Sequence, residues 1–137
     1  MRSLTALLLI LCAACTSNDP PKAAASTPAA CDSGAVTVTA RKGEKPPPLC
    51  LTVGTVLRVT AESSPRQPWS PLTSTDEGVL SCVSRPGPRG TITATCTAER
   101  PGRVTIATVT APFSGDPRGP AQFRWAQQID VVAPHRH

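Results

Sequence analysis

Hydrophobic and polar residues alternate with a period of two along most of the chain from Cys31 onward. The alternation is clearest in residues 91–98, where threonines take every second position and face away from Ile92, Ala94, Cys96 and Ala98. This period is typical of a β-strand that buries one of its faces. Similar stretches predict further strands at residues 36–39, 49–53, 57–61, 79–83, 103–109 and 122–131. About seven short strands and no credible helix indicate an all-β fold, an antiparallel β-sandwich of two packed sheets.

Stretches rich in proline or glycine separate the predicted strands. Three prolines in residues 41–48 remove hydrogen-bond donors from any strand ladder, so this stretch is predicted to be a loop. Residues 62–78 form a long irregular stretch, residues 85–90 (RPGPRG) a turn, and residues 112–120 a further loop. The dipeptide Pro101-Gly102 predicts a turn before the strand at 103–109.

The patterns of two strands and the position of one tryptophan predict which residues fill the core. Val109 has the opposite parity to Val104 and Ile106, which predicts a bulge or two-sided burial near Ala107–Thr108. Trp69 precedes a strand and is expected in the core, whereas its flanking prolines suit a loop that presents it to a partner. In the last strand, parity places four residues on the core face: Phe123, Trp125, Ile129 and Val131.

The first fifteen residues have the layout of an export signal. Arg2 precedes an uncharged apolar run from Leu7 to Leu11, and small residues follow just before Cys15. In this segment the chain resembles a bacterial lipoprotein precursor, and the resemblance implies that Cys15 carries a lipid after cleavage behind Ala14. The alternative is plain secretion. A transmembrane helix needs about 20 apolar residues, roughly twice the length of this run.

This layout divides the chain into four parts. Residues 1–14 are the predicted signal peptide, and residues 15–30 are a lipid-anchored disordered linker. The linker has no large apolar residue beyond Cys15, so burial cannot offset an ordering cost of about 1–2 kcal/mol per residue. Residues 31–133 are the predicted sandwich and residues 134–137 a tail. The expected location is the outer face of the bacterial cytoplasmic membrane, which the protein contacts through its N-terminal lipid.

Four cysteines remain beyond Cys15, and an even number in an exported chain indicates disulfides. Each of the pairs Cys31–Cys50 and Cys82–Cys96 brackets a turn-rich segment between predicted strands, so this connectivity is favoured, and two others stay open. Zinc ligands usually come as closely spaced pairs, and these cysteines are well separated. The two histidines lie in the tail. No metal site is therefore expected.

Composition narrows the function classes. Without residues 1–14 the chain has 13 basic residues, because Arg2 is lost, against 9 acidic ones, a formal charge of +4. The arginines are scattered and few aromatic residues lie among them, so no nucleic-acid partner is expected. The body of the domain lacks histidine, and no Ser–His or Cys–His pair can form in it. Asp76 and Glu77 are interpreted as solvated surface carboxylates. The sequence thus predicts a non-enzyme without a cofactor.

The order of motifs resembles that of bacterial immunoglobulin-like domains. In that family a V-G-x-x-L strand precedes a core tryptophan, and A-x-x-P-G-x-x-x-I follows. This chain has residues 53–57 (VGTVL), Trp69 and residues 98–106 (AERPGRVTI) in that order. The resemblance implies an immunoglobulin-like β-sandwich, and its motifs specify packing and turns rather than chemistry.

A more distant resemblance is to chagasin-type inhibitors of papain-like cysteine proteases, which share this strand order. These inhibitors use three loops at one end of the sandwich. The corresponding segments here are residues 64–68 (SPRQP), 85–90 and 111–113 (APF). The first lacks the glycine and the aromatic residue of the family loop, so no inhibitory residue is carried over.

The leading hypothesis from the sequence is a non-catalytic, lipid-anchored binding or structural module of the cell envelope. Its expected partner is a protein that contacts three loops, Arg66–Ser74, Arg85–Gly90 and Phe113–Arg118. The candidate binding residues are Arg66, Trp69, Arg85, Arg89, Phe113 and Arg118. The alternative is a chagasin-like protease inhibitor that uses the same loops. A third hypothesis is an accessory subunit of a larger envelope complex. The sequence leaves the oligomeric state open.

Overall fold

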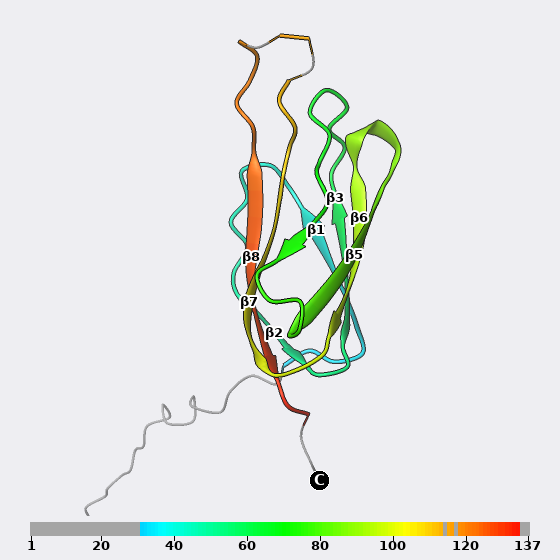
Figure 1. The fold of residues 1–137 in the computed structure, drawn as a ribbon, viewed down its shortest axis with the longest axis vertical. Coiled ribbons are helices and arrows are strands. Elements are labelled where there is room, and N and C mark those ends of the chain that lie inside the picture. Colours follow the sequence, from blue (N-terminus) through cyan, green and yellow to red (C-terminus); the bar gives the residue numbers. More distant parts are fainter. Residues whose placement is uncertain (1–30, 114, 117, 135–137) are drawn as a thin grey trace, which may run out of the picture. The chain divides into compact units, whose positions relative to one another are not determined.

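The computed structural model describes residues 31–113, 115–116 and 118–134. These residues form two four-stranded sheets in an all-β, immunoglobulin-like sandwich, which confirms the predicted fold class (Figure 1). The predicted signal peptide, Cys15 and the linker lie outside the described residues, as does most of the tail. Within the described part of the chain, no helix has the length and apolar character needed to cross a membrane.

The first sheet has the strand order β1-β3-β6-β5. Its strands are β1 (Ala35–Ala40), β3 (Val56–Ala61), β6 (Ile92–Ala98) and β5 (Leu80–Pro86). The threonine-rich strand β6 buries its apolar face as predicted, with Ile92, Ala94, Cys96 and Ala98 almost inaccessible to solvent. A short 3-10 turn (Pro88–Gly90) joins β5 to β6 at the predicted Pro/Gly turn.

The second sheet has the order β2-β8-β7-β4. Its strands are β2 (Leu49–Thr52), β8 (Arg124–Val132), β7 (Gly102–Val109) and β4 (Thr73–Ser74). The two-residue strand β4 lies inside the stretch 62–78, which the sequence predicted to be irregular. The Pro101-Gly102 turn carries the chain from one sheet to the other, since β6 and β7 belong to different sheets.

The sandwich is not purely antiparallel. β1 pairs in parallel with β3, and β2 pairs in parallel with β8, while the remaining pairs are antiparallel. The connection from β1 to β2 crosses between the sheets, so β1 and β2 do not form a hairpin. Each of them instead pairs with a strand that runs in its own direction, β1 with β3 and β2 with β8. Period-two alternation reports which face of a strand is buried and carries no information on the direction of its partner.

The core lies between the two sheets and is filled mainly by aliphatic side chains. Leu57, Val59 and Leu80 come from the first sheet, and Leu51 and Ile129 from the second, all of them fully buried. Trp125 of β8 is the largest fully buried side chain among the described residues. Trp69 is also buried, and its indole Nε1 donates a hydrogen bond of 2.8 Å to the Glu62 carbonyl oxygen. The prediction of Trp69 as a core residue is confirmed.

Two predictions about the second sheet are wrong. β7 has no bulge near Ala107–Thr108, because its pairing with β8 continues unbroken to Val109. Thr108 takes the inward position there and its hydroxyl donates to the Ser70 carbonyl at 2.6 Å, so Val109 points outward. Phe123 was expected on the core face, but it precedes β8 and is 36% exposed.

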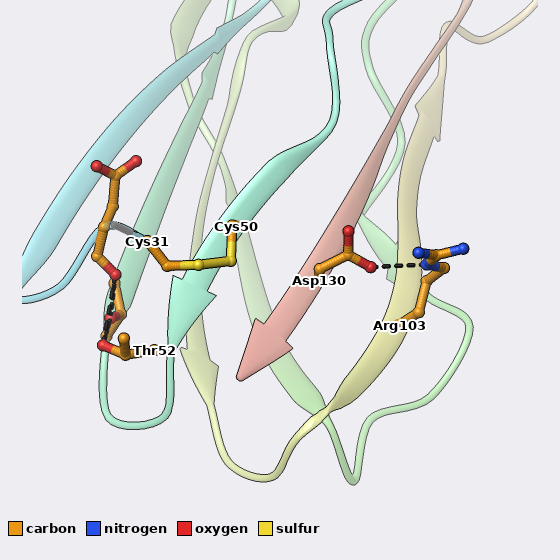
Figure 2. Close-up of a disulfide and its surroundings, with 7 residues drawn as sticks. Cys31, Cys50, Thr52, Arg103 and Asp130 are labelled. Atoms are coloured by element: carbon orange, nitrogen blue, oxygen red, sulfur yellow. Dashed lines mark hydrogen bonds and ion pairs between the residues drawn. A yellow bond between two sulfur atoms is a disulfide. The ribbon is translucent and has the colours of Figure 1, made fainter. Parts of the chain in front are cut away.

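The cysteines pair in the favoured connectivity, Cys31 with Cys50 and Cys82 with Cys96. The first bridge ties the segment before β1 to β2, as Figure 2 shows. The second joins directly opposed residues of β5 and β6. The first bridge thus reinforces a contact already made by the bridge pair Asp32–Leu51, and the second lies within a hairpin.

Candidate recognition surface at one end of the sandwich

The strand directions bring three connections to the same end of the sandwich. These are residues 62–72 after β3, residues 87–91 between β5 and β6, and residues 110–123 between β7 and β8. We call them together the loop end; it is uppermost in Figure 1. The three loops of the sequence-based hypothesis lie largely within these connections.

The first two connections are joined by backbone hydrogen bonds. Ser64 N donates to the Arg89 carbonyl at 2.8 Å, and Trp69 N donates to the Gly90 carbonyl at 3.0 Å. Gly90 has a φ of +74°, and a Cβ atom built there would lie 2.0 Å from the Ser64 carbonyl oxygen. Only glycine fits this close approach, so Gly90 allows the two loops to meet.

The connection 110–123 is joined to the first by a buried glutamine. Gln67 is 5% exposed, and its Nε2 donates to the Pro120 and Ala121 carbonyls at 3.2 and 3.1 Å. Ala111 N donates to the Pro68 carbonyl at 2.8 Å. Because these bonds hold the described parts of the three connections together, the loop end presents a surface ordered before any partner arrives.

Four of the six candidate binding residues lie at this surface. Arg66, Arg89 and Arg118 are exposed, and Phe113 is half-buried. The Phe113 ring lies 5.5 Å from the Arg66 guanidinium carbon, and its other contacts include Gly119, where a Cβ atom would approach the ring to 2.7 Å. Phe113 is therefore held in place rather than free at a loop tip.

The other two candidates do not expose a side chain at the loop end. Trp69 is 4% exposed and cannot contact a partner without unfolding of its surroundings. Arg85 lies within β5, because that strand extends to Pro86, and it lines a shallow hollow of about 500 Å³ on the outer face of the first sheet. The sequence placed Arg85 in a turn because Pro86 follows it, whereas pairing with β6 extends β5 to Pro86. For Trp69 the exposed position was only the alternative to the core position that the structure shows.

Two residues to which the sequence analysis gave no binding role belong with this surface. Lys42, in the connection from β1 to β2, has its Nζ 5.7 Å from the centroid of the Phe123 ring. The pair places a cation over an aromatic face, as Arg66 does over Phe113. Neither residue lies in a sequence motif, and their separation of 81 positions left no local signal.

Carboxylates with catalytic spacing are absent from the described part of this end. Asp76 and Glu77 lie at the opposite end, before β5, and both are exposed. Asp76 Oδ1 accepts a hydrogen bond of 2.9 Å from Gly78 N, which is a turn contact. Among the described residues, no group of three histidine, cysteine, aspartate or glutamate side chains gathers where a metal ion would bind.

Fold and loop end together define a disulfide-bridged, immunoglobulin-like sandwich with a preordered surface at one end. No protein-family model matches the chain, and no curated protein matches it. Among solved structures it is similar to the cysteine protease inhibitor EhICP2 from Entamoeba histolytica, at 10% identity and a TM-score of 0.50, over 71% of this chain and 96% of that one. It is also similar to amebosin, at 15% identity and a TM-score of 0.47, over 69% and 97%. The likeness to EhICP2 establishes a shared fold.

Proposed function

We propose that this protein is a non-catalytic inhibitor of papain-like cysteine proteases that inserts its loop end into the protease cleft. The proposal rests chiefly on one observation, that three connections from different parts of the chain form one hydrogen-bonded surface at one end of a rigid sandwich. A preordered surface loses little entropy on binding, which is what a tight inhibitor requires. The shared fold with EhICP2, an inhibitor of cysteine proteases, supports this function over a passive structural role.

Phe113 is the proposed anchor of the interaction. Its half-exposed ring lies against both Arg66 and Gly119, and aromatic residues with a fixed orientation are common binding hot spots. Residues 64–68 differ from the corresponding loop of chagasin-type inhibitors. The contacts with the protease are therefore expected to come from the side chains that this loop end exposes.

Inhibition of papain tests this function. The purified protein is expected to slow peptide hydrolysis by papain in a dose-dependent, competitive manner. Phe113→Ala is expected to raise the inhibition constant at least about tenfold, equivalent to about 1.4 kcal/mol. Val83→Ala is the matched control, because Val83 is 64% exposed but lies on the outer face of the first sheet. If no member of a panel of papain-like proteases is inhibited, the proposal is refuted.

For the location, we propose a lipid anchor at Cys15 on the outer face of the cytoplasmic membrane. Support comes from the signal layout of residues 1–15 and the apolar-poor linker that follows. Cys15→Ser is expected to abolish lipid attachment, which mass spectrometry of the mature protein would detect as a missing acyl mass. An unmodified N-terminus in the parent protein would instead favour the alternative, plain secretion.

A further inference from the structure

Charge is distributed unevenly between the two ends of the sandwich. The loop end and the neighbouring connection 41–48 contain six basic residues, Arg41, Lys42, Lys45, Arg66, Arg89 and Arg118, against three acidic ones, Glu44, Glu62 and Asp116. The segments at the opposite end, residues 31–34, 53–55, 75–79 and 99–101, contain one basic residue, Arg100, against four acidic ones, Asp32, Asp76, Glu77 and Glu99. A charged partner would therefore approach the loop end in a defined orientation.

Among the described residues, no cation of the loop end forms an ion pair with a carboxylate. In the part of the chain that the structure describes, the single ion pair joins Arg103 to Asp130, away from the loop end (Figure 2). Two of the three carboxylates counted with the loop end accept backbone hydrogen bonds instead. Glu62 Oε1 accepts from Lys42 N at 2.7 Å, and Asp116 Oδ1 accepts from Arg118 N at 2.9 Å.

Arg89 adds a second, independent observation. With φ 58° and ψ 35°, it is the one non-glycine residue at positive φ among those described. This left-handed conformation strains any residue that carries a Cβ atom, and glycine would adopt it freely. The Arg89 carbonyl holds Ser64 N, but its exposed side chain has no hydrogen-bond or ion-pair partner among the described residues. Strain of this kind concentrates at functional sites.

We propose that Arg66, Arg89 and Arg118 bind carboxylates on the rim of the partner's cleft. The target is then a papain-like protease whose cleft has an acidic rim. The inference rests on the proposed function and names the surface chemistry of its target. A guanidinium group binds a carboxylate through two parallel N–H···O bonds, which fixes both distance and orientation. Long-range attraction between unlike charges also speeds the encounter of the two proteins.

The decisive variant is Arg89→Gly. Glycine relieves the left-handed strain and keeps the backbone bonds of the turn, so the melting temperature is expected to rise. Binding is expected to weaken at least about tenfold, because the carboxylate contact is lost. If the Arg89 side chain had only a structural role, the substitution would not raise the melting temperature and weaken binding at the same time. Arg66→Gln supplies a second loop-end variant, and Arg58→Gln is the matched control, since Arg58 is exposed on the outer sheet face.

Inhibition is measured against two papain-like proteases, one with an acidic and one with a basic cleft rim, at about 0.01 M and about 1 M salt. Over this range the screening length falls from about 30 Å to about 3 Å. The acidic-rimmed enzyme is expected to bind at least about tenfold faster at low salt, with Arg89→Gly reducing that gain. Inhibition that does not change with salt concentration, rim charge or the Arg89→Gly substitution would overturn this inference and leave the proposed function standing. If neither of the two enzymes is inhibited, both the inference and the proposed function are refuted.

Discussion

Trp125→Ala is expected to lower the free energy of unfolding by about 3–5 kcal/mol, the range for truncating a large buried aromatic residue. Trp125 is completely buried between the sheets and is the largest fully buried side chain of a core built mainly of valine, leucine, isoleucine and alanine. It belongs to a core cluster with residues from strands of both sheets, and the hydrogen bonds of the sheets limit collapse into the cavity. Equilibrium unfolding in urea, followed by circular dichroism, measures the loss.

Phenylalanine substitutions separate packing from hydrogen bonding at the two tryptophans. The Trp125 indole Nε1 is buried without a partner among the described residues, so Trp125→Phe removes a desolvated donor along with some volume. Trp69→Phe instead loses the bond to the Glu62 carbonyl and leaves that oxygen unpaired. Trp125→Phe is therefore expected to cost less than Trp69→Phe by about 1 kcal/mol. Equal losses for Trp125→Phe and Trp125→Ala would contradict this account of the core.

Removal of both disulfides is expected to leave the domain largely unfolded at 37 °C. The bridged cysteines are 14 and 19 residues apart, and loops of this size contribute about 3 kcal/mol each. Their sum of about 6 kcal/mol is comparable with the whole stability of many domains, which begins at about 5 kcal/mol. Alanine replaces cysteine in these variants because Cys96 is fully buried, and a serine hydroxyl there would be desolvated.

Three variants are compared by thermal unfolding: Cys31→Ala with Cys50→Ala, Cys82→Ala with Cys96→Ala, and all four substitutions together. Each double variant is expected to remain folded at 25 °C with a clearly lower melting temperature. Adding a reductant to the parent protein should reproduce the fourfold variant, which serves as the internal control. A fourfold variant that melts within a few degrees of the parent would show that the aliphatic core suffices alone.

The places where the sequence misled share a physical cause. Thr108 is a polar residue in an inward position, made tolerable by its hydrogen bond to the Ser70 carbonyl. A pattern that sorts residues only as apolar or polar therefore shifted the expected core face to Val109. The prediction that Phe123 lies on the core face was also wrong. Its backbone pairs with Thr110 just before β8, and its ring lies beneath Lys42 rather than in the core.

The sequence by itself determined the all-β class, most of the strands, a Pro/Gly turn within residues 85–90 and the burial of Trp69, because these follow from residues adjacent along the chain. Only the tertiary structure decided the parallel pairing of β1 with β3 and of β2 with β8, and the gathering of three connections at one end. The bonds that join those connections, from Ser64 to Arg89 and from Gln67 to Ala121, link residues 25 and 54 positions apart. Contacts over such separations leave no periodic trace in a single sequence, so the loop end became visible only when the chain was folded.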